Sequence, residues 1–439
     1  MSARRTEAAG ASLLLLATGL YAQTLPVPTL PPERPSVAGP AGTAAGLTAA
    51  GETPGVLGET QPQSWEYRLE VGAGWDSNID FRLPDGPSGM VLSPRGSLAR
   101  VLRSAQGDLR VEGAGSWLGY PENKSLSRFY GDLRLEGGYR PSQNTTWRGS
   151  ASYSLGYNDG SLVLSDQGVM LPLVQARTLT AELAVTRRLG TLTSFRVGAR
   201  AYRTEFADED SDLLGLVDGQ SIRGTTGLER RLGTRDTVGL EYSLEGALSR
   251  QAPEVAPDEG RRYYITHYGS TQWSHLFSPR DGLLLEAGAS YTPDAATVGL
   301  ERRESFYGGA SYSRQIRRSS TILFARREVA PAFGLGVIRV ENRFGLATTI
   351  PMGQSWTLRV RATRIVPETP EGAELSYSTP DEAFVALERR LGRLLLVSGE
   401  ARYRRRSASG TVPEIEGFQA GIFVSLVDPR TIASPRPRR

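Results

Sequence analysis

Histidine is the side chain best suited to general acid–base or metal chemistry at neutral pH, and the chain contains only His267 and His275. They stand eight residues apart in one extended segment, which predicts the same face but a separation of about 26 Å. They therefore cannot share a metal ion or a catalytic triad. The chain also lacks cysteine and a G-x-S-x-G nucleophile turn. We expect no enzyme activity, no catalytic residue, and no metal or cofactor.

Arginine and glutamate recur at every second position along several segments, so that both charges fall on one face. One interpretation is a wall of cross-strand ion pairs that braces a polar interior. The other is a permeation path in which forked guanidinium donors contact anionic or hydroxyl-rich solutes. Both interpretations apply to the same candidate lumen-lining residues: Arg110, Glu112, Arg134, Glu136, Arg148, Arg196, Arg200, Glu241, Glu245, Arg359, Arg361 and Arg402.

The overall charge is small for the length of the chain. Its 439 residues include 51 basic and 47 acidic side chains, for a net charge of +4, and the two signs are interleaved. A nucleic-acid binder usually clusters its excess positive charge, so we expect no nucleic-acid partner. No run of about 18 apolar residues is present to form a membrane helix.

The charged face belongs to long segments with a period of two. In Trp65–Trp75, apolar side chains alternate with charged residues and glycine, which is typical of β-strands with one apolar and one polar face. We predict about 18 such strands, within a range of 16 to 20, and most are longer than ordinary soluble strands. The expected strands are 64–78, 92–104, 108–121, 127–140, 145–158, 175–189, 193–207, 219–232, 236–250, 261–278, 282–293, 303–316, 320–330, 337–350, 354–366, 380–390, 394–406 and 415–427.

The connections alternate between tight turns and longer polar loops. This alternation over an even number of strands predicts an all-β fold, a transmembrane antiparallel up-and-down β-barrel whose short turns face the periplasm. The apolar face then contacts lipid and the polar face lines the lumen. Aromatic residues near the strand ends, among them Trp65, Trp75, Trp147 and Trp356, are expected to form girdles at the membrane interfaces.

The string RRLG occurs at Arg187–Gly190, Arg230–Gly233 and Arg389–Gly392. Each copy ends an even-numbered predicted strand and begins a short turn. We interpret the string as a recurrent turn sequence, in which glycine supplies a permissive backbone and the arginines reach water or lipid phosphate.

The ends of the chain differ from this pattern. Residues 1–22 have a basic start and a short apolar run, as in a secretory signal peptide. Residues 23–63 are rich in Pro, Ala and Gly and are expected to form a disordered periplasmic linker. The barrel is then expected over 64–428 and a basic tail over 429–439.

The whole of 64–427 resembles a Gram-negative outer-membrane β-barrel. Within that class, the stretch GWDSNI at Gly74–Ile79 resembles the aromatic-Asp-x-Asn pattern that opens barrels of the exopolysaccharide-export type. The class resemblance implies location in the outer membrane and, as partners, membrane lipid, lipopolysaccharide and the barrel-assembly machinery. The narrower resemblance implies export of a polysaccharide, with periplasmic export components as partners.

Two other functions fit the same pattern. A passive diffusion porin for small solutes needs the same polar lumen. A structural or adhesive surface barrel would use its long loops to bind partners. The sequence therefore predicts a channel of the outer membrane and leaves its cargo open.

Overall fold

The structure, a computed structural model, describes residues 64–79, 86–158, 174–206, 218–250, 261–293, 304–332, 337–368, 380–407 and 414–428. The expected signal peptide, linker and tail lie outside these residues. The described chain forms 18 strands and one 3-10 helix, η1 (Lys124–Leu126). The strands are β1 (Ser64–Asp76), β2 (Gly89–Arg103), β3 (Gly107–Leu118), β4 (Arg128–Ser142), β5 (Thr145–Asn158), β6 (Val174–Arg188), β7 (Thr193–Phe206), β8 (Gly219–Arg231), β9 (Asp236–Arg250), β10 (Arg261–Ser278), β11 (Asp281–Tyr291), β12 (Glu304–Ile316), β13 (Ser319–Ala332), β14 (Val337–Met352), β15 (Trp356–Pro367), β16 (Pro380–Leu391), β17 (Leu395–Arg406) and β18 (Ile415–Val427).

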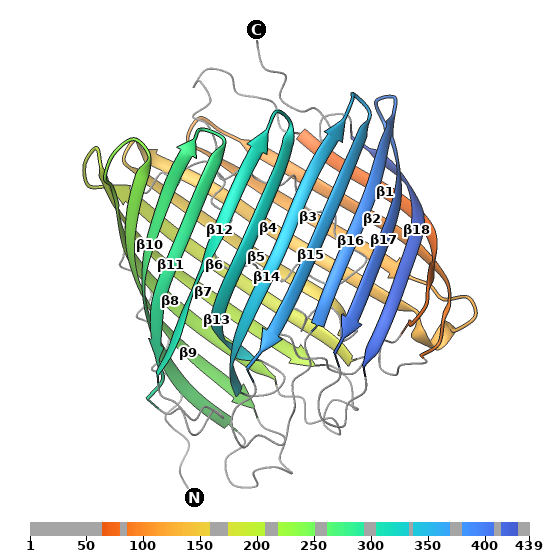
Figure 1. The fold of residues 1–439 in the computed structure, drawn as a ribbon, viewed down its shortest axis with the longest axis horizontal. Coiled ribbons are helices and arrows are strands. Elements are labelled where there is room, and N and C mark those ends of the chain that lie inside the picture. The colour runs from red at the N-terminus through yellow and green to blue at the C-terminus, as the bar shows by residue number, and fades with distance from the viewer. Residues whose placement is uncertain are drawn as a thin grey trace, which may run out of the picture.

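All strands join one antiparallel sheet that closes on itself (Figure 1). Each strand pairs with its neighbours in sequence, and β1 pairs with both β2 and β18. The prediction of an 18-stranded up-and-down barrel is therefore confirmed. The short turns gather at the upper end in Figure 1 and the longer connections at the lower end. Among the described residues, no helix is long and apolar enough to cross a membrane.

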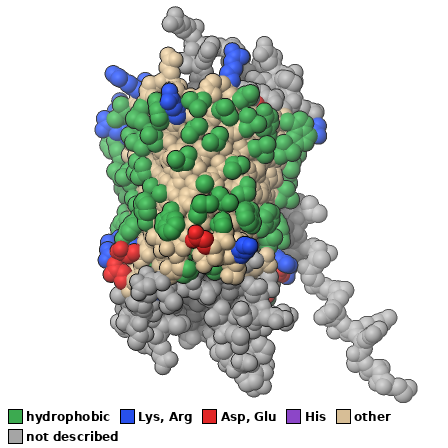
Figure 2. Space-filling view, turned by 90° about the vertical axis from the view of Figure 1, so that its right-hand side faces the viewer, with side chains coloured by type: hydrophobic (Ala, Val, Ile, Leu, Met, Phe, Trp, Pro, Cys, Tyr) green, Lys and Arg blue, Asp and Glu red, His purple; other side chains and the backbone are tan. Residues whose placement is uncertain are grey.

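The two faces of the sheet differ as the alternation predicts. Large apolar side chains lie on the outside, and they form a belt between charged groups at the two ends (Figure 2). On β1, for example, Leu69 is 56% exposed and Val71 66%, whereas Glu70 between them is 4% exposed. The buried side chains on this strand are thus the polar ones that face the interior. Soluble proteins show the opposite arrangement, so the outer face contacts lipid and the inner face lines a charged lumen.

The seam between the first and last strands is closely packed. Phe423 of β18 points inward and lies over Gly72 of β1, where an added methyl carbon would be 2.0 Å from its Cδ1. The guanidinium of Arg95 on β2 lies 4.7 Å from the centre of the same ring. Glycine at position 72 is therefore required for this ring to lie flat across the closure.

The three RRLG strings do end β6, β8 and β16 and begin short turns. Their glycines do not share one conformation, however. Gly392 has a φ of 70°, but Gly190 and Gly233 are not among the positive-φ residues of the described chain. The expectation that glycine serves the same purpose in each turn is wrong. The loops do not differ in length, because Leu189 N–H bonds the carbonyl of Thr193, Leu232 N–H bonds that of Asp236, and Leu391 pairs with Leu395. Three residues therefore lie between the cross-strand partners in each case, and the three glycines differ in backbone angle alone.

This difference makes a controlled prediction. An added methyl group would meet no atom within 4 Å at Gly190, Gly233 or Gly392, so only the backbone angle distinguishes the three. We expect Gly392→Ala to lower the free energy of unfolding by about 1 kcal/mol, because alanine is strained at positive φ. Gly190→Ala and Gly233→Ala should leave it unchanged or slightly raised. Urea unfolding in lipid, followed by tryptophan fluorescence, checks this; equal losses in all three variants would contradict it.

Candidate functional site: the charged inner wall

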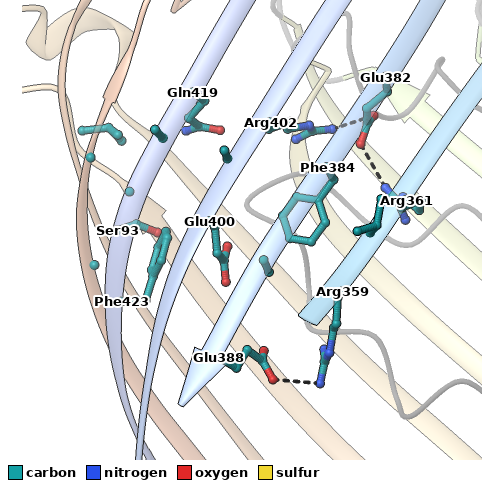
Figure 3. A pocket seen from close by; sticks show the side chains of 18 of the residues that line it. Ser93, Arg359, Arg361, Glu382, Phe384, Glu388, Glu400, Arg402, Gln419 and Phe423 are labelled. Carbon is teal, nitrogen blue, oxygen red and sulfur yellow. Dashed lines mark hydrogen bonds and ion pairs between the residues drawn. The ribbon is translucent and has the colours of Figure 1, made fainter. Parts of the chain in front are cut away.

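The densest charged cluster lies on the inner face of β15, β16 and β17 (Figure 3). Glu382 of β16 stands between two arginines, 3.0 Å from Arg361 of β15 and 2.9 Å from Arg402 of β17. Further along β16, Glu388 lies 3.2 Å from Arg359 of β15. Side chains of three neighbouring strands are thus joined in the lumen wall.

The strand register explains why these pairs are diagonal. Arg361 lies directly opposite Phe384, and Arg359 opposite Ala386. Each arginine therefore passes its direct neighbour to reach a carboxylate further along the same face, which its long side chain allows. Because arginine is planar and forked, one carboxylate can hold two guanidiniums.

A cavity of about 110 Å³ that opens to solvent adjoins this cluster. Its lining includes small residues, among them Gly72, Gly74 and Ala347. Charged and polar groups also line it, and Figure 3 shows Glu400, Gln419 and Phe384 directed into the same space. The recess offers donors, acceptors and an apolar surface to a solute in the lumen.

A second cluster lies beside the seam. Glu70 on β1 accepts hydrogen bonds from Arg68, at 2.7 Å, and from the hydroxyl of Ser425 on β18. It also lies 3.0 Å from Arg95 on β2. Because Glu70 is 4% exposed, its charge depends on these partners, which come from three strands.

The other predicted lumen residues also lie on the inner face, but away from these two clusters. Arg110 lies 2.6 Å from Glu66 and 2.9 Å from Glu112. Looser pairs join Arg134 to Glu136 at 3.9 Å and Arg196 to Glu182 at 3.7 Å. The inward positions of β5, β7 and β9 hold the remaining members: Arg148, Arg200, Glu241 and Glu245.

Glu245 belongs to an aromatic part of the wall. It accepts a hydrogen bond of 3.1 Å from the hydroxyl of Tyr268, and the guanidinium of Arg223 lies 4.3 Å from the centre of that ring. Tyr307 packs edge-on against Tyr268, with ring centres 5.9 Å apart. The inner wall is therefore ionic on one side and tyrosine-rich on another.

Several residues of these clusters are absent from the sequence-based set: Glu66, Glu70, Arg95, Arg223, Glu382 and Glu388. All fall on the inward positions of their strands, so the same alternation could have identified them. Their partners could not be identified in this way, because diagonal contacts depend on the register between strands.

The stretch Gly74–Ile79 has an internal structural role. Asp76 accepts a hydrogen bond from the Asn78 backbone N–H at 3.1 Å, and the Asn78 side chain donates to the carbonyl of Glu416 at 3.2 Å. Arg404 approaches both residues, 3.6 Å from Asp76 and 3.3 Å from the Asn78 carbonyl. Ile79, 2% exposed, packs in an apolar cluster with Val91, Leu118, Tyr120 and Tyr130. The motif therefore fastens the first long connection to the barrel wall.

The four predicted girdle tryptophans lie near strand ends. Trp65 is 51% exposed, Trp75 49% and Trp356 36%, while Trp147 is half-buried near the start of β5. The two histidines also lie on the outer face. His267 bonds the hydroxyl of Tyr242 at 2.8 Å, and His275 bonds Asp236 at 2.8 Å. No group of three or more metal-ligating side chains occurs in the described residues.

Part of the chain is similar to a known protein family. Residues 66–243, from β1 to the middle of β9, match the model of a family described as "Putative beta-barrel porin 2". No curated protein matches the sequence. Among solved structures, a mutant ferric enterobactin receptor of Pseudomonas aeruginosa is 7% identical, with 83% of this chain and 80% of that chain covered and a TM-score of 0.46. The siderophore receptor PirA of Acinetobacter baumannii is 6% identical, with 84% and 81% covered and a TM-score of 0.45.

The closed barrel, its apolar belt and the match of residues 66–243 to a porin family lead to one conclusion. The chain is an outer-membrane β-barrel whose N-terminal part is similar to a porin family.

The Glu382 cluster gives the second prediction. Glu382→Gln removes the charge that two arginines share, one of them only 7% exposed, so we expect the free energy of unfolding to fall by about 3 kcal/mol. Glu136→Gln is the matched control, because Glu136 is 50% exposed and 3.9 Å from its partner; it should cost less than about 0.5 kcal/mol. Urea unfolding in lipid measures both. Equal losses would mean that burial does not determine the strength of these pairs.

Proposed function

We propose that the protein is a passive diffusion channel for small hydrophilic solutes. The observation that carries this proposal is a closed barrel with an apolar outer belt and an inner wall of charged and hydroxyl side chains. The match to a porin family supports the same function. A wall of this kind replaces part of the hydration shell of a polar solute with donors and acceptors.

The pairing of charges sets the expected selectivity. Arg359, Arg361 and Arg402 each contact a glutamate, so their fields largely cancel at distances beyond the pair. We infer a channel with weak ion selectivity, whose guanidinium donors make local contacts to hydroxyl-rich or anionic solutes. Removal of the charge on one partner of a pair should then leave the electrostatic field of the other partner uncompensated.

Export of a polysaccharide, the function implied by Gly74–Ile79, has weaker support. The polar groups of Asp76 and Asn78 are engaged by Arg404, Glu416 and the local backbone, so they are not presented to a cargo. None of the comparisons names a polysaccharide. An adhesive function would depend on long loops, most of which lie outside the described residues.

Ion selectivity in planar bilayers tests the proposal. The wild-type barrel should conduct steadily, with a cation-to-anion permeability ratio near one. Arg361→Gln with Arg402→Gln should shift the ratio toward cations by about twofold or more, because Glu382 is left uncompensated. Glu382→Gln should shift it toward anions. Arg364→Gln is the matched control on β15, since Arg364 lies on the outer face near Asp381, and it should leave the ratio unchanged.

Two outcomes would reject a diffusion channel. One is a correctly folded barrel that does not conduct and does not admit sugars in liposome-swelling assays. The other is a deletion strain that loses its surface polysaccharide while small-solute uptake stays normal, which would favour export instead.

A further inference from the structure

The short-turn end of the barrel is strongly basic. Its eight turns, all within the described residues, contain no acidic side chain and five arginines: Arg235, Arg280, Arg317, Arg318 and Arg393. Three acids lie at the adjoining strand ends: Asp108 lies opposite Arg103 in the β2–β3 register, Asp236 bonds His275, and Asp281 pairs with Arg314. Figure 2 shows basic side chains above the apolar belt at this end.

Each RRLG string places one arginine on the outer face of the barrel and one on the inner face. Arg230 follows Leu228, 42% exposed on the lipid side, by two positions and so shares its face. Arg389 likewise follows Leu387, 39% exposed, and Arg187 pairs in register with Phe195 on the outer face of β7. The second arginine of each string, Arg188, Arg231 or Arg390, must face the lumen because successive residues of a strand alternate.

Two outward arginines at this end stack on tryptophans across a strand pair. Arg389 lies 5.1 Å from the ring centre of Trp356, and Arg100 lies 5.1 Å from that of Trp65. Stacking uses the face of the guanidinium and leaves its N–H groups directed around its edge. Each pair therefore combines an amphipathic ring suited to the headgroup level with a forked donor at the same depth.

We propose that these outward arginines, Arg100, Arg187, Arg230 and Arg389, which are spread around the barrel on β2, β6, β8 and β16, each bind the phosphate of an anionic phospholipid in the leaflet at the short-turn end. Forked guanidinium donors suit phosphate oxygens. Exposed apolar side chains two positions away, such as Leu228 and Leu387, suit acyl chains. A soluble anionic protein would not fit as well, because the tryptophans and leucines of the same surface face lipid.

The repeated string supplies a matched experiment. One variant carries Arg187→Gln, Arg230→Gln and Arg389→Gln; the control carries Arg188→Gln, Arg231→Gln and Arg390→Gln, with the same net charge and the same turns. Purified full-length barrels are placed in phosphatidylcholine bilayers with increasing amounts of brominated phosphatidylglycerol. Quenching of tryptophan fluorescence then gives the relative affinity for the anionic lipid.

We expect the wild type and the inward control to prefer phosphatidylglycerol, and the outward variant to lose that preference by about tenfold. The preference should also fall at high salt, since it depends on exposed charges. It should persist in excess inorganic phosphate, which lacks the acyl chains that contact the apolar belt. Equal losses in the two triple variants would overturn the proposal, because total charge at the end of the barrel would then explain the effect. The absence of any preference in the wild type would overturn it as well.

Discussion

The structure depends on one constraint, which is that a sheet surrounded by lipid can leave no edge unpaired. Lipid offers no hydrogen-bond partner, so every backbone N–H and C=O must find one within the protein. The chain satisfies this by pairing β1 with β18. The register along that seam matches Arg68 with Val427 at one end and Asp76 with Gln419 at the other, so closure determines where the first and last strands must stop.

Closure then determines where the charges lie. When both edges of a strand are hydrogen-bonded to neighbours, its side chains can point only to the outer or the inner face of the sheet. The outer face contacts lipid and must be apolar. Most ionic side chains away from the ends of the described strands therefore lie on the lumen wall, where they are close to one another. Glu382, shared by Arg361 and Arg402, and Glu70, shared by Arg68 and Arg95, show the result. The ion pairs are thus a consequence of the barrel architecture.

The sequence was sufficient to predict most of the fold, because a period of two is a local property. The expected strands 145–158, 236–250, 261–278 and 415–427 agree with the structure at both ends, and others differ by up to three residues, as for β2, which begins at Gly89. The lumen face was also predictable, since each of the chosen residues occupies an inward position. The ion-pair partners could not be predicted. Arg361 lies opposite Phe384 but pairs with Glu382, and such a diagonal contact can be identified only when the register between the two strands is known. The backbone geometry of the turns was not predictable either, because identical RRLG strings begin loops of equal length and only one of their glycines has a positive φ.

The seam has a consequence for how the chain assembles. Glu70 is placed by β1, near the start of the chain, but Ser425 and the ring over Gly72 arrive with β18, the final strand. Until then the first strand presents a carboxylate and a bare glycine on an open sheet. The last strand therefore supplies three things to β1 together: the backbone partners of its free edge, the Ser425 hydroxyl bonded to Glu70, and the Phe423 ring over Gly72.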